Sequence, residues 1–325
     1  MTTLVTGGAG YIGSHVVRLL EERGDAVLVV DDLSSGSPER VGGATLVELD
    51  LAGPAATTAL TAVMREHGVT SVVHFAAKKQ VAESVARPTY YYRQNVGGLV
   101  NLLDAMHGAA VSRLVFSSSA AVYGETVQAR VGEDSPTAPA NPYGETKLVG
   151  EQLARDAAAA WGLRFVALRY FNVAGTGWPD LADPGAANLV PLVMDRIDAG
   201  LAPLVFGDDY PTPDGSCIRD YVHVLDLAEA HLAALGRLEE AATSADHDVF
   251  NVGTGTGASV LEVVRAFEDV VGHRVVPEVV GRRAGDPPQV VAATDRAAEE
   301  LGWRARHGLD AIVRSAWEAR HPVAP

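Results

Sequence analysis

A tyrosine and a lysine stand four residues apart in the segment NPYGETK, residues 141–147, which has the pattern of a helix start. Residues four apart share one helix face, so we expect the phenol of Tyr143 and the ammonium of Lys147 to point the same way. A free phenol has a pKa of about 10 and is a poor base near neutral pH. Because a nearby cation lowers such a pKa by roughly one to three units, the pair predicts a tyrosine that acts as a general base.

A serine in the run VFSSSAAVYG is a third candidate for this chemistry. Residues 113–118 read as a parallel strand with Ser119 at its end, and ligands of such sheets bind beyond the carboxyl ends of the strands. The hydroxyl of Ser119 is therefore predicted to hydrogen-bond both the tyrosine and a substrate hydroxyl. Each feature alone is common at protein surfaces, and the prediction depends on their order along one chain.

The first half of the chain alternates short β-branched runs with segments at helical spacing. This alternation predicts an α/β fold with a doubly wound parallel Rossmann sheet and a smaller C-terminal α/β substrate lobe. A capping box of Ser259 and Glu262 predicts a helix that ends near Gly272, and Asp295 and Gly302 bracket another. We expect strands at residues 3–7, 26–31, 45–50, 71–76, 113–118 and 164–170.

The segment VTGGAGYIG places Gly7, Gly10 and Gly13 between the first predicted strand and the first predicted helix. This is the context in which glycines let backbone amides approach a pyrophosphate at a helix N-terminus. Asp31 ends the second strand, where a carboxylate can accept hydrogen bonds from ribose hydroxyls and repel a 2′-phosphate, and Asp32 adds to that repulsion. The predicted cofactor is therefore NAD and not NADP.

The chain of 325 residues carries a formal net charge of −15, which disfavours nucleic acids and anionic membranes as partners. An anionic small substrate would need a local cluster of arginines. The single Cys217 excludes an internal disulfide, and no spacing typical of a zinc site is present, so no metal is predicted. With neither a signal peptide nor a membrane span expected, we predict a cytoplasmic location.

The chain resembles the extended short-chain dehydrogenases and, among them, the UDP-glucose 4-epimerases, over nearly its whole length. The segments that carry the resemblance are VTGGAGYIGSH, VVHFAAKKQVAESV, FSSSAAVYGE, NPYGETKL, LRYFNVAG, VFGDDYPTPDGSCIRDYVHVLDLAEAH and RRAGDPP. It implies an NAD-binding domain over residues 1–172, to which a segment near 221–246 returns, and a nucleotide-sugar-binding lobe over residues 173–325. It also implies that Tyr143 is the base, that Lys147 is its electrostatic partner and a ribose ligand, and that Ser119 orients the sugar.

The resemblance implies further binding residues for both ligands. Those for the cofactor are Gly7, Gly10, Tyr11, Ile12, Gly13, Asp31, Asp50, Leu51, Phe75, Ala76, Lys79, Asn95, Tyr143, Lys147 and Tyr170. Those for the UDP-sugar substrate are Ser119, Tyr143, Asn172, Asn188, Leu189, Phe206, Arg219, Arg283, Asp286 and Val290. Arg219 and Arg283 would supply the local positive charge for a diphosphate, with Arg282 and Arg169 as further candidates.

The implied reaction is reversible, NAD-dependent 4-epimerisation of UDP-hexoses, UDP-galactose to UDP-glucose, through a transient 4-keto sugar. Relatives that go on to eliminate water or lose CO₂ carry acidic residues directly after the active-site hydroxyl residue, where this chain has Ala120 and Ala121. Two departures from the family are Ala121, often a threonine, and Val173, often a proline.

Three alternatives stay open on the sequence alone. Val290 stands where relatives with a narrow pocket have a tyrosine, so UDP-N-acetylhexosamines are further expected substrates, although this valine could equally pack in a loop. The substrate could instead be UDP-glucuronate or UDP-xylose. A non-catalytic NAD-sensing module is a third alternative. Apolar positions near 88–106 and 143–160 suggest a homodimer, or packing on the chain's own sheet.

Overall fold

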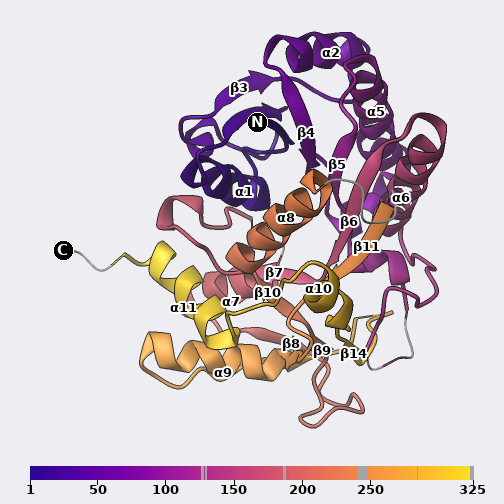
Figure 1. Ribbon diagram of the computed structural model, residues 1–325. Coiled ribbons are helices and arrows are strands. Elements are labelled where there is room, and N and C mark those ends of the chain that lie inside the picture. Colours follow the sequence, from indigo (N-terminus) through magenta and orange to yellow (C-terminus); the bar gives the residue numbers. More distant parts are fainter. Residues whose placement is uncertain (126–127, 129, 186–187, 241–246, 284, 323–325) are drawn as a thin grey trace. The chain divides into compact units, whose positions relative to one another are not determined.

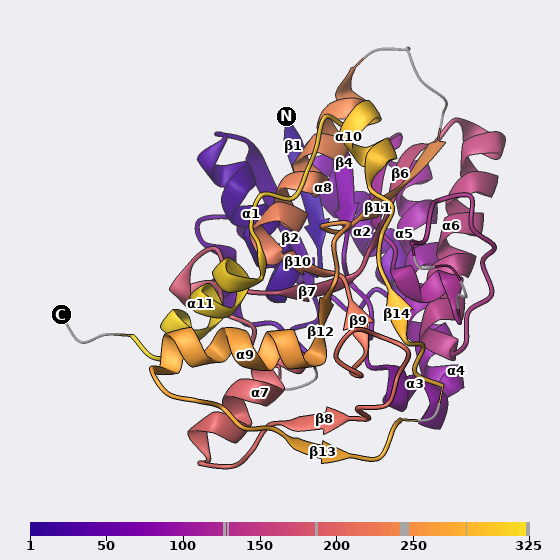
Figure 2. The same cartoon turned by 90° about the horizontal axis from the view of Figure 1, so that it is seen from below.

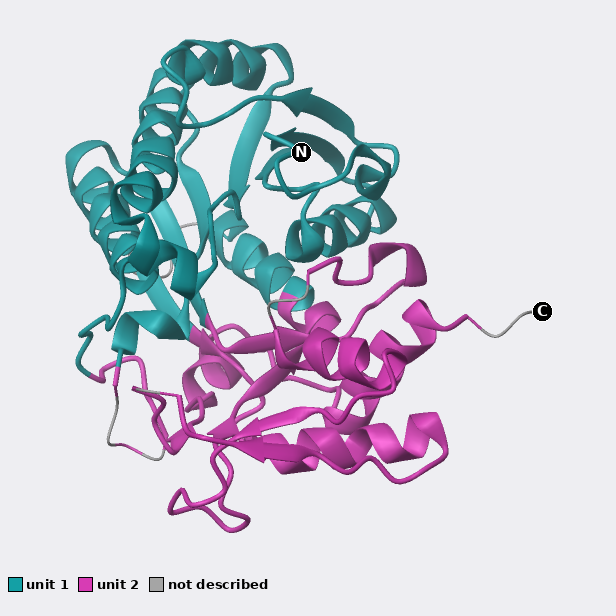
Figure 3. Ribbon diagram, turned by 180° about the vertical axis from the view of Figure 1, so that it is seen from behind, with its two compact units in different colours: residues 1–124, 136–169, 228–250 teal, residues 125–135, 170–227, 251–325 magenta. Residues whose placement is uncertain are grey.

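The computed structural model describes residues 1–125, 128, 130–185, 188–240, 247–283 and 285–322 (Figure 1). The chain divides into two compact units (Figure 3). Unit 1 contains Met1–Gly124, Pro136–Arg169 and Ala228–Phe250, and unit 2 contains Glu125–Ser135, Tyr170–Leu227 and Asn251–Pro325. The chain leaves unit 1 first after Gly124 and again after Arg169, whereas the sequence analysis expects one departure at residue 172. Residues 241–246, at the end of the predicted returning segment, lie outside the described residues.

Unit 1 is built on a sheet of seven described strands in the order β11-β6-β5-β4-β1-β2-β3. The neighbouring pairs from β6 to β3 are parallel. The strand bounds are β1 Thr2–Thr6, β2 Ala26–Asp31, β3 Thr45–Glu48, β4 Val69–His74, β5 Arg113–Ser117, β6 Arg164–Tyr170 and β11 His247–Val252. The predicted parallel Rossmann sheet is confirmed, and the runs are apolar because helices cover both faces of such a sheet.

The helices of unit 1 follow from the strand order. Strand β1 leads to β2 in one direction across the sheet and β4 leads to β5 in the other, so right-handed crossovers place α1 and α5 on opposite faces (Figure 1). The helix bounds are α1 Tyr11–Glu22, α2 Ala56–Glu66, α3 Val81–Ala86, α4 Pro88–Tyr91, α5 Gly98–Gly108 and α6 Pro142–Trp161, with short 3-10 helices η1 Pro38–Val41 and η3 Ala120–Tyr123 and a π-helical turn η2 Tyr92–Gly97. Helix α8, Val224–Glu239, begins in unit 2 and continues into unit 1.

Four predicted strands end one or two residues earlier than expected. Strands β1 and β5 end at Thr6 and Ser117, one residue early, and β3 and β4 end at Glu48 and His74, two residues early. Ser119 therefore does not end a strand: it is the N-cap of η3, and its side chain accepts a hydrogen bond from the Ala121 amide. This local hydrogen bond competes with continuation of the strand.

Unit 2 contains short strands and four complete helices in its described residues. Two strands, β8 and β13, pair in parallel, and Figure 2 shows them side by side. The bounds are β7 Asn172–Ala174, η4 Pro179–Leu181, α7 Leu189–Asp198, β8 Leu204–Phe206, β9 Ile218–Arg219, β10 Tyr221–His223, β12 Ala258–Ser259, α9 Val260–Val271, β13 Glu278–Val280, β14 Gln289–Val290, α10 Asp295–Glu300 and α11 Leu309–Arg320. No helix in the described part of the chain combines the length and the apolar character needed to cross a membrane.

Helix α9 organises the core of unit 2. The predicted capping box of Ser259 and Glu262 is present, and Gly272 ends the helix in the left-handed conformation at φ 74°. The apolar face of α9 buries Val263 and Phe267 against residues of α7 and α11. The helix α10 begins at the predicted Asp295, with Thr294 as its N-cap.

The carboxylate of Asp220 is a second organising feature of unit 2. It is fully buried and accepts hydrogen bonds from the Thr254 amide and hydroxyl, both at 2.7 Å, from the Gly255 amide at 2.9 Å and from the Ala292 amide at 3.1 Å. One side chain thus joins the segment after β9 to two others that are distant in sequence.

Replacing Asp220 by alanine is expected to destabilise unit 2. The buried amides of Gly255 and Ala292 and the half-buried amide of Thr254 would lose their acceptor, and each unsatisfied donor costs on the order of 1 kcal/mol, so the free energy of unfolding should fall by about 3 kcal/mol. Urea denaturation followed by circular dichroism measures this. The exposed Asp269 on α9 provides the control, because Asp269→Ala should change stability by less than about 0.5 kcal/mol. Equal effects of the two substitutions would contradict the prediction.

Candidate functional site

The amino end of α6 carries the predicted base and its partner. Asn141 caps the helix by accepting the Gly144 amide at 3.0 Å, and Pro142 occupies the first turn, where it suits a helix start. Tyr143 and Lys147 are both buried, with exposed fractions of 8% and 3%. They lie on the buried face of α6, as the four-residue spacing predicted.

The turn after β5 packs closely against this end of α6. A Cβ atom at Gly144 would lie 2.5 Å from the Ala121 carbonyl oxygen, so only glycine permits the approach. Within the turn, the Ser119 Oγ accepts the Ala121 amide at 3.1 Å. The Ser119 side chain also hydrogen-bonds Tyr143, which lowers the pKa of the phenol as donation to the phenolate oxygen does. The structure thus brings together the serine and the tyrosine.

Burial dominates the electrostatics of this group. It raises the pKa of Tyr143, and the hydrogen bond from Ser119 opposes it. Burial also lowers the pKa of Lys147 to about 8, and the ammonium donates to the Ser117 carbonyl at 2.7 Å. The sequence predicted a lowered tyrosine pKa, and the net direction here is the opposite. The reason is that a buried phenolate loses its hydration, which the local spacing of residues does not reveal.

The glycine segment between β1 and α1 fits a dinucleotide. Gly7 has φ +71°, and a Cβ there would lie 2.7 Å from the Ala76 amide nitrogen. A Cβ at Gly13 would lie 2.2 Å from the Gly7 carbonyl oxygen, so the turn closes only without side chains. Gly10 is the N-cap of α1 and supplies no side-chain cap, and the start of this helix, with Tyr11 and Ile12 as its first residues, is a setting that suits an anion.

The carboxylate of Asp31 ties the end of β2 to the glycine segment. It accepts the Ala9 amide at 3.0 Å and the Leu33 amide at 2.9 Å. Burial raises the pKa of Asp31, and these two hydrogen bonds oppose that shift. The lone pairs that remain on this buried carboxylate, 6% exposed, can accept hydrogen bonds from ribose hydroxyls. The placement therefore fits the adenosine ribose of NAD.

The neighbouring Asp32 has a partner that the sequence did not indicate. Lys78, in the segment after β4, donates to its carboxylate at 3.1 Å and to the Ser34 hydroxyl at 2.5 Å. Burial would raise the pKa of Asp32, but the hydrogen bonds from Ser34 and Lys78 bring it below its usual value. The repulsion of a 2′-phosphate predicted for Asp32 is thus partly offset by the ammonium of Lys78.

The segment after β4 is held by Asn95, which lies on the π-helical turn η2. Its side-chain amide accepts from the Lys78 amide at 2.8 Å and donates to the Lys78 carbonyl and to Thr146, each at 3.0 Å. Asn95 thereby connects this segment to α6. The next residue, Lys79, places its ammonium 6.0 Å from the centre of the Tyr11 ring. The predicted cofactor residues Tyr11, which begins α1, and Lys79 therefore lie close together.

The remaining predicted cofactor residues lie at the ends of strands or in the segments that follow them. Asp50 accepts the Ala52 amide at 2.9 Å in the segment after β3. Leu51 is buried in the core of unit 1, 7% exposed. Phe75 and Ala76 follow β4, and both of their amides donate to the Thr6 carbonyl. Tyr170 is assigned to unit 2 and ends β6.

Part of the predicted nucleotide site is assembled within unit 2. Strands β9 and β14 pair so that Arg219 and Val290 are partners. Arg219 also donates to the Asp286 carboxylate at 3.3 Å and to the Pro287 carbonyl at 2.9 Å. The guanidinium of Arg283 lies 3.8 Å from the centre of the Phe206 ring. The guanidinium groups of both arginines are thus held in place by neighbouring residues of unit 2.

Three predicted substrate residues lie elsewhere in unit 2. Asn188 is the N-cap of α7 and donates to the Asp183 carboxylate at 3.1 Å, and Leu189 is the first residue of that helix. Asn172, on β7, pairs with Tyr221 on β10.

The two additional arginine candidates have other partners. Arg282 binds Asp209, and its guanidinium lies 4.1 Å from the centre of the Tyr210 ring. Arg169 is buried in unit 1 and binds Glu151. The sequence analysis missed this glutamate, although its place one turn after Lys147, on the same helix face, was a signal.

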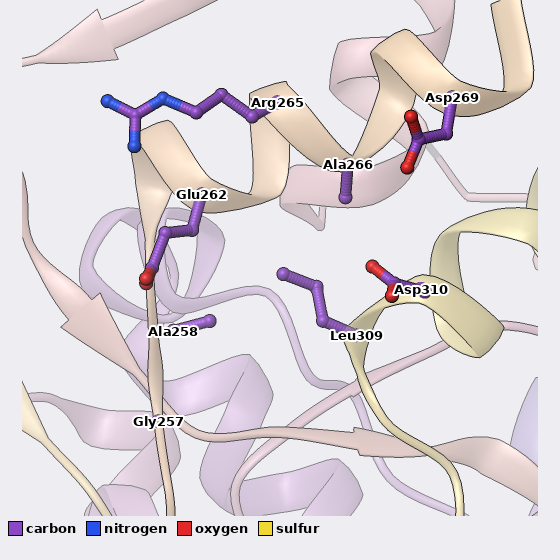
Figure 4. A pocket seen from close by; sticks show the side chains of 8 residues that line it. All are labelled: Gly257, Ala258, Glu262, Arg265, Ala266, Asp269, Leu309 and Asp310. Atoms are coloured by element: carbon purple, nitrogen blue, oxygen red, sulfur yellow. The ribbon is translucent and has the colours of Figure 1, made fainter.

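A surface hollow of about 450 Å³ in unit 2 does not fit the predicted ligands. It lies between α9 and the start of α11, and Figure 4 shows the side chains that line it. Its acidic residues Glu262, Asp269 and Asp310 outnumber its one basic residue, Arg265, which disfavours a diphosphate. Within the described residues, no group of three or more His, Cys, Asp or Glu side chains is placed to hold a metal ion.

Known proteins are similar over almost the whole chain. A UDP-glucose 4-epimerase of Azospirillum brasilense is 49% identical over 323 residues, which cover 97% of this chain and 91% of that protein. The structure of UDP-glucose 4-epimerase from Brucella ovis in complex with NAD has a TM-score of 0.92 at 43% identity and covers 98% of both chains. That of the enzyme from Stenotrophomonas maltophila with bound NAD and formylated UDP-arabinopyranose also has a TM-score of 0.92, at 41% identity, and covers 99% of this chain and 98% of that one.

A family model leads to the same result. The model of the NAD dependent epimerase/dehydratase family matches residues 3–253, which include the glycine segment, the turn after β5 and α6. Because this match covers more than half of the chain and the relatives are similar over nearly all of it, the chain belongs to the NAD dependent epimerase/dehydratase family.

Proposed function

We propose that this protein is an enzyme that uses NAD to interconvert UDP-galactose and UDP-glucose by epimerisation at C4 of the hexose. The observation that carries the proposal is the buried group on α6 and the turn after β5. There the Ser119 side chain hydrogen-bonds Tyr143, and Lys147 lies one helical turn further on. The glycine segment and Asp31 of the same unit fit the dinucleotide.

In this reaction Tyr143 removes the proton from O4 of the sugar as C4 is oxidised, which gives a 4-keto sugar. The ammonium of Lys147 favours the phenolate, and Ser119 holds both the phenol and the sugar hydroxyl. The NAD that the glycine segment and Asp31 would hold would supply the acceptor of the C4 hydride and the donor for its return. After the sugar turns over about its diphosphate, Tyr143 returns the proton to O4 and the other epimer forms.

The side chains after Ser119 support epimerisation against related reactions on 4-keto sugars. Elimination of water or loss of CO₂ requires a further acid or base close to the keto sugar. Ala120 and Ala121 have methyl side chains in the turn, and neither can transfer a proton. The re-reduced sugar is therefore the expected product.

The substrate partner is a UDP-sugar, and relatives solved with such ligands support this choice. Arg219 and Arg283 of unit 2 are the proposed contacts to the diphosphate, because a chain with net charge −15 needs local cations for an anion. Asp286 would then release part of its contact with Arg219. UDP-glucuronate and UDP-xylose are less favoured alternatives, and substrate profiling distinguishes them.

Assembly and location belong to the proposal as well. The exposed apolar residues Val81, Val85, Tyr92 and Val100 lie on α3, η2 and α5, and this exposed surface supports a homodimer in which it would be buried. Sedimentation equilibrium would test it against the chain mass of 34.0 kDa. The one cysteine, Cys217, is buried and free, which supports a reducing cytoplasmic location.

Purified protein should convert UDP-galactose to UDP-glucose without net formation of NADH, because each cycle regenerates the cofactor. Tyr143→Phe should lower kcat by about 10² to 10⁴ while the protein stays folded and retains NAD. Chromatography of the sugar nucleotides and absorbance of NADH measure the two quantities. Tyr90→Phe is the control, because it removes a phenol from α4 outside the site, and it should leave kcat unchanged. Steady accumulation of NADH would instead mean a net dehydrogenase, and a fully active Tyr143→Phe would favour the NAD-sensing alternative.

Lys147→Met should displace the pH dependence of kcat to higher pH. An ammonium favours the phenolate, so its removal raises the pKa of Tyr143 and leaves less base at neutral pH. The pKa of Lys147 itself is about 8, so the wild type loses this help as the pH rises through 8. The ratio of wild-type to variant kcat should therefore be largest below pH 8 and decrease above it. A ratio that does not vary with pH would show that Lys147 acts otherwise.

Val290 favours a second substrate class, the UDP-N-acetylhexosamines. This side chain is small and half-buried on β14, beside Arg219. Wild-type protein should epimerise UDP-N-acetylglucosamine, and Val290→Tyr should lower kcat/KM for it at least about tenfold more than for UDP-galactose. Val279→Tyr, on the exposed face of β13, controls for the added ring. No turnover of the N-acetylated sugar by an enzyme active on UDP-galactose would refute this prediction.

A further inference from the structure

A buried ion pair joins α6 to β6 close to the catalytic group. The Glu151 carboxylate binds the Arg169 guanidinium through two parallel hydrogen bonds, at 2.9 and 2.7 Å. The exposed fractions of the side chains are 1% and 6%. Two parallel hydrogen bonds fix both planar groups in one orientation, so this pair is a rigid reference point inside unit 1.

The same pair holds both ends of the turn that carries Ser119. On one side, the Ser118 hydroxyl donates to the Glu151 carboxylate at 2.5 Å. On the other side, the guanidinium of Arg169 donates to the Tyr123 hydroxyl at 3.0 Å and lies 4.9 Å from the centre of that ring. Ser118 directly precedes Ser119, and Tyr123 ends η3.

From these contacts we infer that Glu151 and Arg169 are positioning residues for the epimerase reaction, which hold Ser119 in hydrogen-bonding contact with Tyr143. The inference rests on the proposed function. Glu151 lies on the helix that carries the base, so the ion pair fixes the turn relative to α6 itself. Neither residue touches the reacting atoms in this assignment: both act through the placement of Ser119.

The hydroxyl of Ser119 depends on this placement. Its oxygen already accepts the Ala121 amide at 3.1 Å, which directs its proton toward Tyr143. A hydrogen bond weakens steeply when its donor moves away or tilts, so a small shift of the turn would reduce the contact. Burial already raises the pKa of Tyr143, and the contact with Ser119 is what opposes that rise.

The chemistry of the pair suits positioning better than simple stabilisation. Burying two charges costs free energy that their attraction only partly returns, and apolar residues of similar volume often serve stability as well. The two charged groups instead form hydrogen bonds of fixed direction to each other, to Ser118 and to Tyr123. We therefore assign the pair the role of holding the turn in place.

The test uses Ser118→Ala, which removes the link between the ion pair and the turn but keeps both charges. With UDP-galactose, kcat at pH 7 should fall about tenfold with KM changed less than twofold. The acid limb of the kcat profile should move to higher pH, because a weaker Ser119 contact raises the pKa of Tyr143. The activity should therefore recover as the pH rises. A merely structural role would change stability without moving this limb.

The matched control is Ser71→Ala. Ser71 is a buried serine on β4 of the same sheet, and its hydroxyl hydrogen-bonds Thr3 at 3.1 Å. Like Ser118→Ala, this substitution removes a buried serine hydroxyl and its hydrogen bond, but at a position far from α6 in the sequence. Its loss of stability should be similar, and its pH profile should coincide with that of the wild type. If both variants shift the acid limb equally, or if neither does, the positioning role is overturned.

A second variant and a second measurement test the positioning role separately from the proposed epimerase function. Tyr123→Phe breaks the other link and keeps the ring beneath Arg169, and it should shift the limb in the same direction by less. It also replaces Ser118→Ala if that variant does not fold. Ultraviolet titration of the Tyr143 phenol, taken as the difference from Tyr143→Phe, follows the pKa without any assay of activity. If Ser118→Ala raises the pKa of Tyr143 although the wild-type protein has no epimerase activity, only the proposed function is contradicted. If the protein is an active epimerase and Ser118→Ala leaves the pKa of Tyr143 unchanged, the positioning role is contradicted.

Discussion

The close docking of the amino end of α6 on the turn after β5 is the contact on which the catalytic group depends. Gly144 makes it possible, because any Cβ there would collide with the Ala121 carbonyl. The helix then buries Lys147 against the Ser117 carbonyl and brings Tyr143 to Ser119. Burial has a cost for both ionisable groups, since it raises the pKa of the phenol and lowers that of the ammonium. The pKa of Lys147 is thereby brought to about 8, whereas burial moves the pKa of Tyr143 away from neutral pH and the hydrogen bond from Ser119 opposes that shift.

Single side chains also hold together the segments of unit 1 that are predicted to bind the dinucleotide. The Asp31 carboxylate accepts the Ala9 amide, so the residue predicted to bind the ribose also fixes the glycine segment that is predicted to face the pyrophosphate. Asn95 connects the segment after β4 to α6 and so links predicted cofactor residues to the helix that carries the predicted base. The pairing of Asp32 with Lys78 shows that the local charge beside a ribose site is not the sum of the acidic residues in one segment.

The proposed diphosphate contacts of unit 2 supply local positive charge in an acidic chain. Arg219 is held by the Asp286 carboxylate, and the guanidinium of Arg283 lies against the Phe206 ring. A guanidinium that is already held loses less conformational entropy when it binds a phosphate. The buried carboxylate of Asp220 next to Arg219 in sequence holds the strand segment from which this arginine projects.

The sequence by itself determined the features that depend on neighbours along the chain. The strand at residues 26–31, the cap at Ser259 and the shared face of Tyr143 and Lys147 all follow from short periodicities and local hydrogen bonds, and the structure has them where they were predicted. Only the tertiary structure decided the direction of the tyrosine pKa and the burial of Arg169 with its carboxylate partner. Both depend on which distant segments exclude water from a side chain, and desolvation has no signature in the spacing of residues.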